Sequence, residues 1–286
     1  MRLAYVDGRF APLASAAVSV EDRGFQFSDG VYEVWAVLNG RLADWDGHYA
    51  RLRRSLSELR IAEPMGEGAL LSVLREAIRR NRVRDGLLYL QVTRGQARRD
   101  HPFPLASVRP TVVATCRPVR LADWEARGRD GVAVITQPDI RWARCDIKSV
   151  ALLPNVLAKQ AAREAAAAEA WLVDDTGLVT EGASTNAWII DAEGVLRTRS
   201  TQANILRGVT RTGLMAILAE EGLAVEERPF RPEEARGARE AFFTAASAFV
   251  SPVVKIDGAV IGDGRPGPVT TRLRRLYLDH ARRTAI

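Results

Sequence analysis

Residues 145–160 read CDIKSVALLPNVLAKQ and contain two of the three lysines in a chain that has 41 lysines and arginines together. The third lysine is Lys255, and arginine fills every other basic position. Arginine cannot replace lysine where a nitrogen must lose its proton and attack a carbonyl, because the guanidinium group stays protonated. Lys148 stands among apolar residues at a predicted strand end, whereas Lys159 falls on the outer face of a predicted helix. Lys148 is therefore a candidate nucleophile, and a solvated surface charge is the alternative.

Length and composition limit the possible classes of protein. The chain has 286 residues, of which 47% are hydrophobic and 27% are charged, as is typical of a globular protein with a sizeable core. No apolar run approaches the ~20 residues that span a bilayer, and the N-terminal stretch MRLAYVDGRF lacks the layout of a signal peptide. We therefore expect a cytoplasmic protein without membrane contact.

The ionisable residues argue against two further classes. Two cysteines and three histidines are too few for a disulfide framework or a zinc site, so we expect no metal. The net charge is +6, but the arginines are interleaved with acids along amphipathic helices, without a patch of aromatic residues. We therefore expect no nucleic-acid partner.

The pattern along the chain predicts a mixed α/β fold in two unequal parts. An Asn39-Gly40 pair between apolar runs predicts a hairpin. Apolar residues at helical spacing predict helices over residues 46–61 and about 67–82. The expected parts are a smaller N-terminal α/β domain (1–118), a polar and aperiodic inter-domain connection (119–129) and a larger C-terminal domain (130–286).

Five stretches of the sequence form a more specific pattern. They are RGFQFSDGVYEV (23–34), VTRGQARRDHPFP (92–104), RCDIKSVALLPNVLAKQ (144–160), VTEGASTNAW (179–188) and ILRGVTR (205–211). Together, and in this order, they resemble the class IV, fold type IV, pyridoxal-phosphate aminotransferases. That family includes branched-chain aminotransferases, D-amino-acid aminotransferases and aminodeoxychorismate lyase. The resemblance implies a two-domain fold with pyridoxal 5′-phosphate between the domains and held mainly by the C-terminal one.

The resemblance gives two residues central roles. Lys148 would bind the cofactor covalently through its amine and then act as the base and acid that moves the substrate Cα proton. Glu181, in VTEGASTN, would face the pyridine nitrogen and keep it protonated, because a carboxylate stabilises a neighbouring cation. An acid in a turn after a strand is the alternative for Glu181.

The same resemblance implies a phosphate site. Gly208 precedes an amphipathic helix, so the backbone N–H groups of Val209 and Thr210 are free to point at an anion. Arg51 would add a guanidinium whose fork suits a phosphate, although a solvent-facing arginine is the alternative. A late loop, TAAS (244–247), would add another contact, but Ala246 stands where many relatives have a hydroxyl residue.

Substrate choice rests on a third group of residues. Tyr32, together with Arg99 and His101 in QARRDHPFP, resembles the carboxylate trap of D-amino-acid aminotransferases. In the family this loop crosses a subunit interface, which implies a homodimer. We therefore expect a ping-pong transfer of the amino group from a D-amino acid, such as D-alanine, to a 2-oxo acid, either 2-oxoglutarate or pyruvate. For His101, a turn residue before a proline is the alternative.

Other activities remain open at this point. A branched-chain L-aminotransferase, an (R)-amine transaminase and aminodeoxychorismate lyase share the cofactor residues. A vitamin B6-binding or basic-surface binding protein would keep the fold without turnover. Two positions also depart from the pattern: Pro154 replaces a frequent glycine in the first turn of a helix, where proline is tolerated, and Trp35 is either a core residue or a wall of the pocket.

Overall fold

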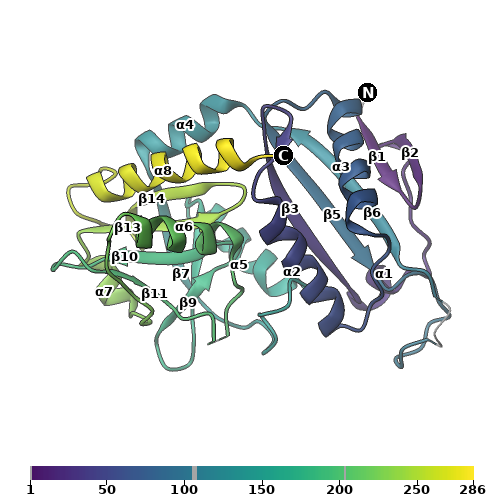
Figure 1. Cartoon of the computed structure of the whole chain (residues 1–286). Helices are drawn as coiled ribbons and strands as arrows, with labels where there is room; N and C mark the ends of the chain where they lie inside the picture. Colours follow the sequence, from purple (N-terminus) through teal and green to yellow (C-terminus); the bar gives the residue numbers. More distant parts are fainter. Residues whose placement is uncertain (1, 105–107, 203) are drawn as a thin grey trace. The chain divides into compact units, whose positions relative to one another are not determined.

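The computed structural model describes residues 2–104, 108–202 and 204–286, and the chain divides into two compact units (Figure 1). Unit 1 comprises Met1–Arg120, Ile147–Ala151 and Thr284–Ile286, and unit 2 comprises Leu121–Asp146 and Leu152–Arg283. Lys148 therefore belongs to unit 1, although the residues before and after its short segment belong to unit 2.

Unit 1 contains a six-stranded antiparallel sheet in the order β2-β1-β6-β5-β3-β4. Its strands are β1 (Leu3–Val6), β2 (Arg9–Pro12), β3 (Gly30–Leu38), β4 (Arg41–Leu42), β5 (Gly86–Thr93) and β6 (Thr111–Pro118). The β3–β4 hairpin turns at Asn39 and Gly40, which have φ values of 51° and 78°. Both residue types tolerate this left-handed backbone, so the hairpin expected there is confirmed.

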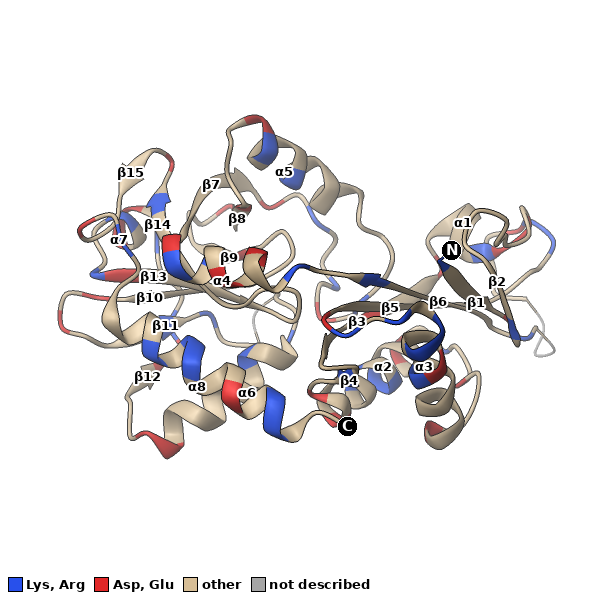
Figure 2. Ribbon diagram, turned by 90° about the horizontal axis from the view of Figure 1, so that it is seen from above, with Lys and Arg blue, Asp and Glu red and all other residues tan. Residues whose placement is uncertain are grey.

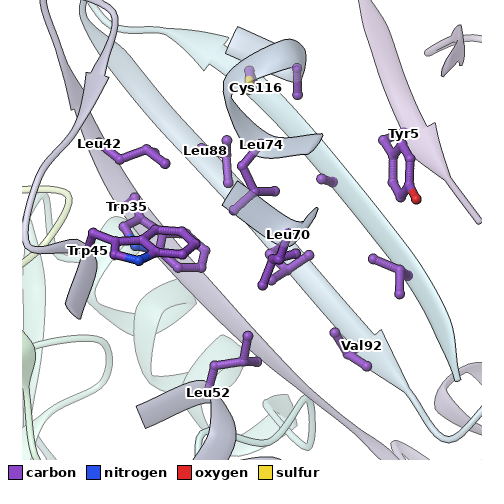
Figure 3. Packing of buried hydrophobic residues seen from close by; sticks show 14 of the residues in the cluster. Tyr5, Trp35, Leu42, Trp45, Leu52, Leu70, Leu74, Leu88, Val92 and Cys116 are labelled. Atoms are coloured by element: carbon purple, nitrogen blue, oxygen red, sulfur yellow. The ribbon is translucent and has the colours of Figure 1, made fainter. Parts of the chain in front are cut away.

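The described residues of unit 1 also form the helices α1 (Arg23–Phe27), α2 (Trp45–Glu58) and α3 (Glu67–Asn81). The apolar faces of α2 and α3 cover one face of the sheet, where Leu52 and Leu74 are almost fully buried (Figure 3). Trp35 is fully buried in the same cluster, and its ring stacks on that of Trp45 with centroids 5.7 Å apart. Trp35 is therefore a core residue.

Unit 2 contains a mixed nine-stranded sheet, with eight strands in the order β12-β11-β10-β13-β14-β7-β8-β9 and β15 paired with β14. Its strands are β7 (Val132–Pro138), β8 (Glu169–Val173), β9 (Val179–Gly182), β10 (Asn186–Ile190), β11 (Leu196–Thr198), β12 (Val225–Glu226), β13 (Glu240–Ala245), β14 (Phe249–Ile256) and β15 (Ala259–Val260). β10 is buried along its whole length, as expected for a central strand with both faces covered.

The helices of unit 2 are α4 (Leu121–Asp130), α5 (Leu153–Glu164), α6 (Val209–Glu220), α7 (Pro232–Arg236) and α8 (Pro268–Thr284). Helix α4 lies where we expected an irregular connection over 119–129. Its anchor is Trp124, which is buried, donates Nε1–H to the Ser247 carbonyl at 3.0 Å and meets the Phe249 ring edge-on. A single buried aromatic on a polar helix gives too weak a periodicity to recognise in the sequence.

Both units combine helices with sheets, so the mixed α/β class is confirmed. Basic and acidic residues lie on helices of both units (Figure 2). None of the described helices is long and apolar enough to cross a membrane. Within the same residues, no group of three or more His, Cys, Asp and Glu side chains is placed to hold a metal ion.

Candidate active site

The segment that carries Lys148 joins unit 1 along the edge of β3. The Tyr32 N–H donates to the Lys148 carbonyl and the Val150 N–H donates to the Gly30 carbonyl, each at 3.0 Å. The Lys148 N–H also donates to the Ser55 hydroxyl of α2 at 3.2 Å. These three bonds fix the backbone at Lys148, so the position of its side chain is set by a strand edge rather than by a free loop.

The side chain of Lys148 lies over an aromatic ring. Its Nζ atom is 4.1 Å from the centroid of Tyr32, and the Tyr32 ring stacks on Tyr89 with centroids 5.7 Å apart. A cation over a ring face is attracted by the ring quadrupole. Lys148 is half-buried, so its amine is held in place and remains within reach of a small molecule. The structure thus brings together Tyr32 and Lys148, which the sequence placed 116 positions apart.

Arg51 lies in a buried cluster on the helix-covered face of the same strand. Its Nε and Nη2 atoms donate to the two oxygens of Glu33 at 2.7 and 2.8 Å, and His48 Nδ1 is 2.7 Å from Glu33 Oε2. His48, Arg51 and Ser55 follow one another at three- and four-residue spacing, which puts them on one face of α2. Arg51 is therefore on the helix face that contacts the backbone of Lys148 through Ser55.

The charges in this cluster stabilise one another. Burial alone raises the pKa of Glu33, but the positive charge and hydrogen bonds of Arg51, with help from His48, lower it to about 2. Burial lowers the pKa of His48, against the opposing effect of Glu33. Glu33 is thus an anion that holds the Arg51 guanidinium in a fixed orientation. A small part of the Arg51 side chain stays exposed.

Arg99 and His101 lie on an exposed loop of unit 1, against the ring of Phe27. The Arg99 guanidinium carbon is 4.6 Å from the Phe27 centroid, and the His101 ring centroid is 5.4 Å from it. Arg23 donates to the carbonyls of Asp100 and His101 at 2.6 and 3.2 Å, and it is held by Asp29 through a 2.8 Å bond.

This anchoring shows that the loop is preorganised by α1. Arg99 and His101 have Phe27 as their neighbour, whereas Tyr32 has Lys148 and Tyr89. The expected carboxylate trap is therefore presented in two separate groups of residues within one chain.

Glu181 is buried in unit 2 and accepts hydrogen bonds on both of its oxygens. Oε1 accepts from Arg141 Nη1 at 2.5 Å and from the Leu206 N–H at 3.1 Å, and Oε2 accepts from Asn186 Nδ2 at 2.9 Å. Burial raises its pKa, while Arg141 and the Leu206 N–H oppose that shift. A carboxylate has about four acceptor positions, so these three donors leave Oε2 able to accept one more.

The start of α6 offers donors to an anion. The cap residue Gly208 has no side chain to cap the helix, and the first N–H groups, including those of Val209 and Thr210, have no partner within it. The Thr210 hydroxyl is buried and has no hydrogen-bond partner among the described residues. Asn186 connects this helix start to Glu181, because its Nδ2 also donates to the Leu206 carbonyl at 3.0 Å.

Two buried side chains donate hydrogen bonds to carbonyl groups in, or directly after, the turn over residues 244–247. Trp124 binds the Ser247 carbonyl, and Arg274 Nη1 donates to the Ala248 carbonyl at 3.1 Å. Phe249, which follows the turn, has a φ of 58°, an uncommon value for an aromatic residue. The backbone of the turn is thus rigidly set, and the missing hydroxyl at Ala246 leaves only its N–H for an anion.

Several residues of these clusters were not identified from the sequence. Glu33 had a recognisable signal, because it is a charged residue in the buried register of β3 between Val31 and Trp35. Asn186 belongs to the quoted VTEGASTNAW stretch but has no charge to mark it. Arg141 has no distinguishing signal in a chain so rich in arginine.

Comparison with known proteins identifies the family. The family model for amino-transferase class IV matches residues 30–256. A D-alanine aminotransferase of Bacillus licheniformis is 44% identical over 268 residues, which cover 94% of this chain and 93% of that relative. A D-alanine aminotransferase of Staphylococcus haemolyticus is 38% identical over 275 residues, which cover 96% of this chain and 96% of that relative. This chain belongs to the class IV aminotransferases.

Solved structures agree with this assignment. A branched-chain amino acid aminotransferase of Escherichia coli superposes with a TM-score of 0.90 at 22% identity, covering 98% of this chain and 94% of the other, which shows the shared fold. A branched-chain amino acid aminotransferase of T.th., complexed with N-(5′-phosphopyridoxyl)-L-glutamate, has a TM-score of 0.86 at 27% identity, covering 97% and 93%.

These matches confirm the expected fold, the enzyme class and the resemblance to D-amino-acid aminotransferases. Class IV aminotransferases use pyridoxal 5′-phosphate, so this is the cofactor of the chain. The residues present fit it: a lysine amine fixed at a strand edge, a buried carboxylate with one acceptor position left, and a helix start with an unpartnered buried hydroxyl.

Proposed function

We propose that this enzyme transfers the amino group of D-amino acids, such as D-alanine, to a 2-oxo acid, either 2-oxoglutarate or pyruvate, by a ping-pong mechanism. The observation that carries the proposal is the 44% identity to a D-alanine aminotransferase over 94% of the chain. The substrates are therefore small molecules, and we place the enzyme in the cytoplasm. Its two cysteines, Cys116 and Cys145, are both free, which suits a reducing compartment.

Lys148 is the catalytic residue in this proposal. Pyridoxal phosphate, when bound, supplies an aldehyde that accepts an amino group and a ring that withdraws electrons. Lys148 would hold the cofactor through its amine, and the same amine would serve as the base and acid that move the substrate Cα proton. The bonds at its backbone and the ring of Tyr32 support this role, because a proton can be moved between two fixed atoms only by a group held near both.

Glu181 would keep the ring nitrogen of the cofactor protonated, because Oε2 has an acceptor position left beside its bond from Asn186. The backbone N–H groups of Val209 and Thr210 and the Thr210 hydroxyl would be the donors to its phosphate, where the helix dipole also favours negative charge. Arg51, oriented by Glu33, would be a further guanidinium for the phosphate.

Tyr32, Arg99 and His101 bind the carboxylate of the amino acid. The loop of Arg99 and His101 is exposed and preorganised by Arg23, which supports its use by a second copy of the chain in a homodimer. A guanidinium and an imidazole beside the same ring would give a carboxylate two directional donors.

A branched-chain L-aminotransferase is the second candidate, because the solved structures named above are enzymes of that kind. Its weight is lower, because those structures are only 22% and 27% identical to this chain. An (R)-amine transaminase would bind a substrate without an amino-acid carboxylate, and a lyase would bind a bulkier substrate. Each of them would therefore need a different substrate-binding site.

A substrate panel tests the proposal. Purified enzyme loaded with pyridoxal phosphate should be yellow, and D-alanine should bleach it and yield pyruvate, while L-leucine and (R)-1-phenylethylamine react far more slowly. Faster turnover of L-leucine would make the second candidate correct. A yellow protein that no amine bleaches would be a binding protein rather than an enzyme.

A further inference from the structure

Glu181 is the end of a chain of charges that begins at Asp139. Asp139 follows β7, and its N–H is fixed by the Val173 carbonyl at 2.8 Å. Both oxygens of Asp139 bind Arg141, with Nε to Oδ1 at 2.9 Å and Nη2 to Oδ2 at 2.7 Å. The remaining terminal nitrogen, Nη1, donates to Glu181 Oε1 at 2.5 Å. Arg141 is thus a bridge between two carboxylates, and its planar fork uses one edge for each.

The three side chains are shielded from water. Arg141, Asp139 and Glu181 have side-chain exposures of 8%, 11% and 5%. The Thr180 hydroxyl donates to Asp139 Oδ2 at 2.7 Å, so the outer end of the bridge is itself held in place. At such burial a charge acts on its neighbour through an effective dielectric far below that of water.

The net charge of Asp139, Arg141 and Glu181 together determines how well Glu181 could stabilise a cation. A buried Glu181 with Arg141 alone would form a neutral pair, and a protonated ring nitrogen beside it would also face the positive charge of Arg141. Asp139 offsets that positive charge. Two carboxylates and one guanidinium leave one net negative charge, which suits a pyridinium.

Each member also has an orienting role. Arg141 and the Leu206 N–H both donate to Oε1, which fixes the orientation of the carboxylate. Oε2 accepts only from Asn186 and keeps one acceptor position for a further donor. Burial raises the pKa of Glu181, and Arg141 is the largest influence that opposes this shift. Without Arg141, the carboxyl group would tend to take up a proton and could no longer balance a cation.

Resting on the function proposed above, we propose that Arg141 and Asp139 are positioning residues that set the protonation of the cofactor ring. Arg141 keeps Glu181 ionised and oriented, and Asp139 cancels the charge of Arg141 so that the ring nitrogen keeps its proton. Among the described residues, these two carry the charges with the largest effect on Glu181. The nearby Cys145 thiol, whose pKa burial raises to about 11, stays neutral at the pH of the experiment.

Nitrogen-15 NMR of enzyme loaded with pyridoxal phosphate labelled at the ring nitrogen tests this directly, because the chemical shift reports whether that nitrogen is protonated. Asp139→Asn keeps the shape of the side chain and removes its charge, together with one of its two acceptor oxygens. We expect the ring nitrogen of this variant to bind its proton about tenfold more weakly, which moves its deprotonation down by about one pH unit. Arg141→Met should also lower the protonated fraction, and should weaken binding of the cofactor.

Asp191→Asn is the matched control, because Asp191 pairs with Arg197 in unit 2 at similar exposure and outside this bridge. Its chemical shift should equal that of the parent. Glu181→Gln separates the two proposals. If that variant keeps the parent's protonated ring, the role of Glu181 itself is wrong; if it loses the proton while Asp139→Asn and Arg141→Met retain the parent's titration, only the role of the bridge is overturned. Thermal unfolding of each apo variant checks that the fold persists.

Discussion

The side-chain nitrogen of Lys148 lies 4.1 Å from the ring centroid of Tyr32, although the two residues come from distant parts of the chain. The contact exists because the segment 147–151 pairs with the edge of β3. None of the described carboxylates lies within ion-pair distance of Lys148. A carboxylate there would favour the protonated amine, which cannot attack a carbonyl. The ring of Tyr32 holds the amine without forming an ion pair.

Replacing Lys148 with Ala should lower the turnover of D-alanine by about 10³-fold or more, because the group that moves the proton is lost. The variant should still bind pyridoxal phosphate non-covalently through the anion site. Steady-state kinetics and equilibrium dialysis measure the two effects. Lys255→Ala is the control, because Lys255 is exposed on β14, and it should behave like the parent. Near-parental turnover by Lys148→Ala would show that another residue is the base.

Replacing Arg99 with Ala should raise the KM for D-alanine about tenfold to a hundredfold and change kcat much less, because a charged hydrogen bond to the carboxylate is lost. Arg98→Ala removes the neighbouring exposed arginine and should leave both constants unchanged. An equal rise in KM for both variants would point to a general charge effect. Unchanged kinetics in Arg99→Ala would remove this loop from the substrate site.

Glu33→Gln should change how stability depends on pH. The pKa of Glu33 falls from 4.5 to about 2 on folding, so its charge stabilises the fold at neutral pH, and this contribution disappears as the pH falls from 4.5 toward 2. The shift corresponds to about 3 kcal/mol. The variant should therefore melt below the parent at pH 7, and the difference should shrink by pH 3.

Thermal unfolding of the parent and Glu33→Gln at pH 7, 5, 4 and 3 measures this convergence. Glu63→Gln is the control, because Glu63 pairs with Arg53 at an exposed site where solvent screens the interaction. It should melt with the parent throughout. A constant gap between parent and Glu33→Gln would mean that the buried carboxylate does not titrate as described.

Gly208→Ala should weaken cofactor binding through Asn186. A Cβ atom at position 208 would lie 2.0 Å from Asn186 Oδ1, so the amide that binds both Glu181 and the Leu206 carbonyl must move. We expect the Kd for pyridoxal phosphate to rise at least about tenfold, as for the loss of hydrogen bonds to a charged group. The backbone itself is not strained, because Gly208 has a φ of −61°.

Fluorescence titration with pyridoxal phosphate measures the Kd. Gly68→Ala, at a position where a Cβ atom meets nothing within 4 Å, should bind as the parent does. If Gly208→Ala binds the cofactor normally, the start of α6 is not its anion site.

Local patterns in the sequence were sufficient for much of the fold and for part of the site. The Asn39-Gly40 turn and the apolar face of α2 are local signals, and both appear in the structure. The motif residues Lys148 and Glu181 could be named from their neighbours in the chain. Their surroundings could not, because these depend on pairing between distant segments.

Three residues show this limit. Lys148 joins unit 1 through backbone hydrogen bonds between its segment and β3. No local sequence pattern encodes these bonds. The partner of Arg51 is Glu33. The burial of Glu33 could be predicted from the sequence pattern of its strand, but its contact with Arg51 could not. Arg141 is one arginine among many, and only the three-dimensional structure separates it from the others.

The central claim is that the Lys148 amine binds the cofactor aldehyde, and reduction of the loaded enzyme with borohydride followed by peptide mass spectrometry tests it most directly. The chain has only three lysines, so the result is unambiguous. We predict a phosphopyridoxyl group on the peptide that contains Lys148, and none on Lys159 or Lys255. A label on either of the other lysines, or no label on a protein that transaminates, would contradict the account.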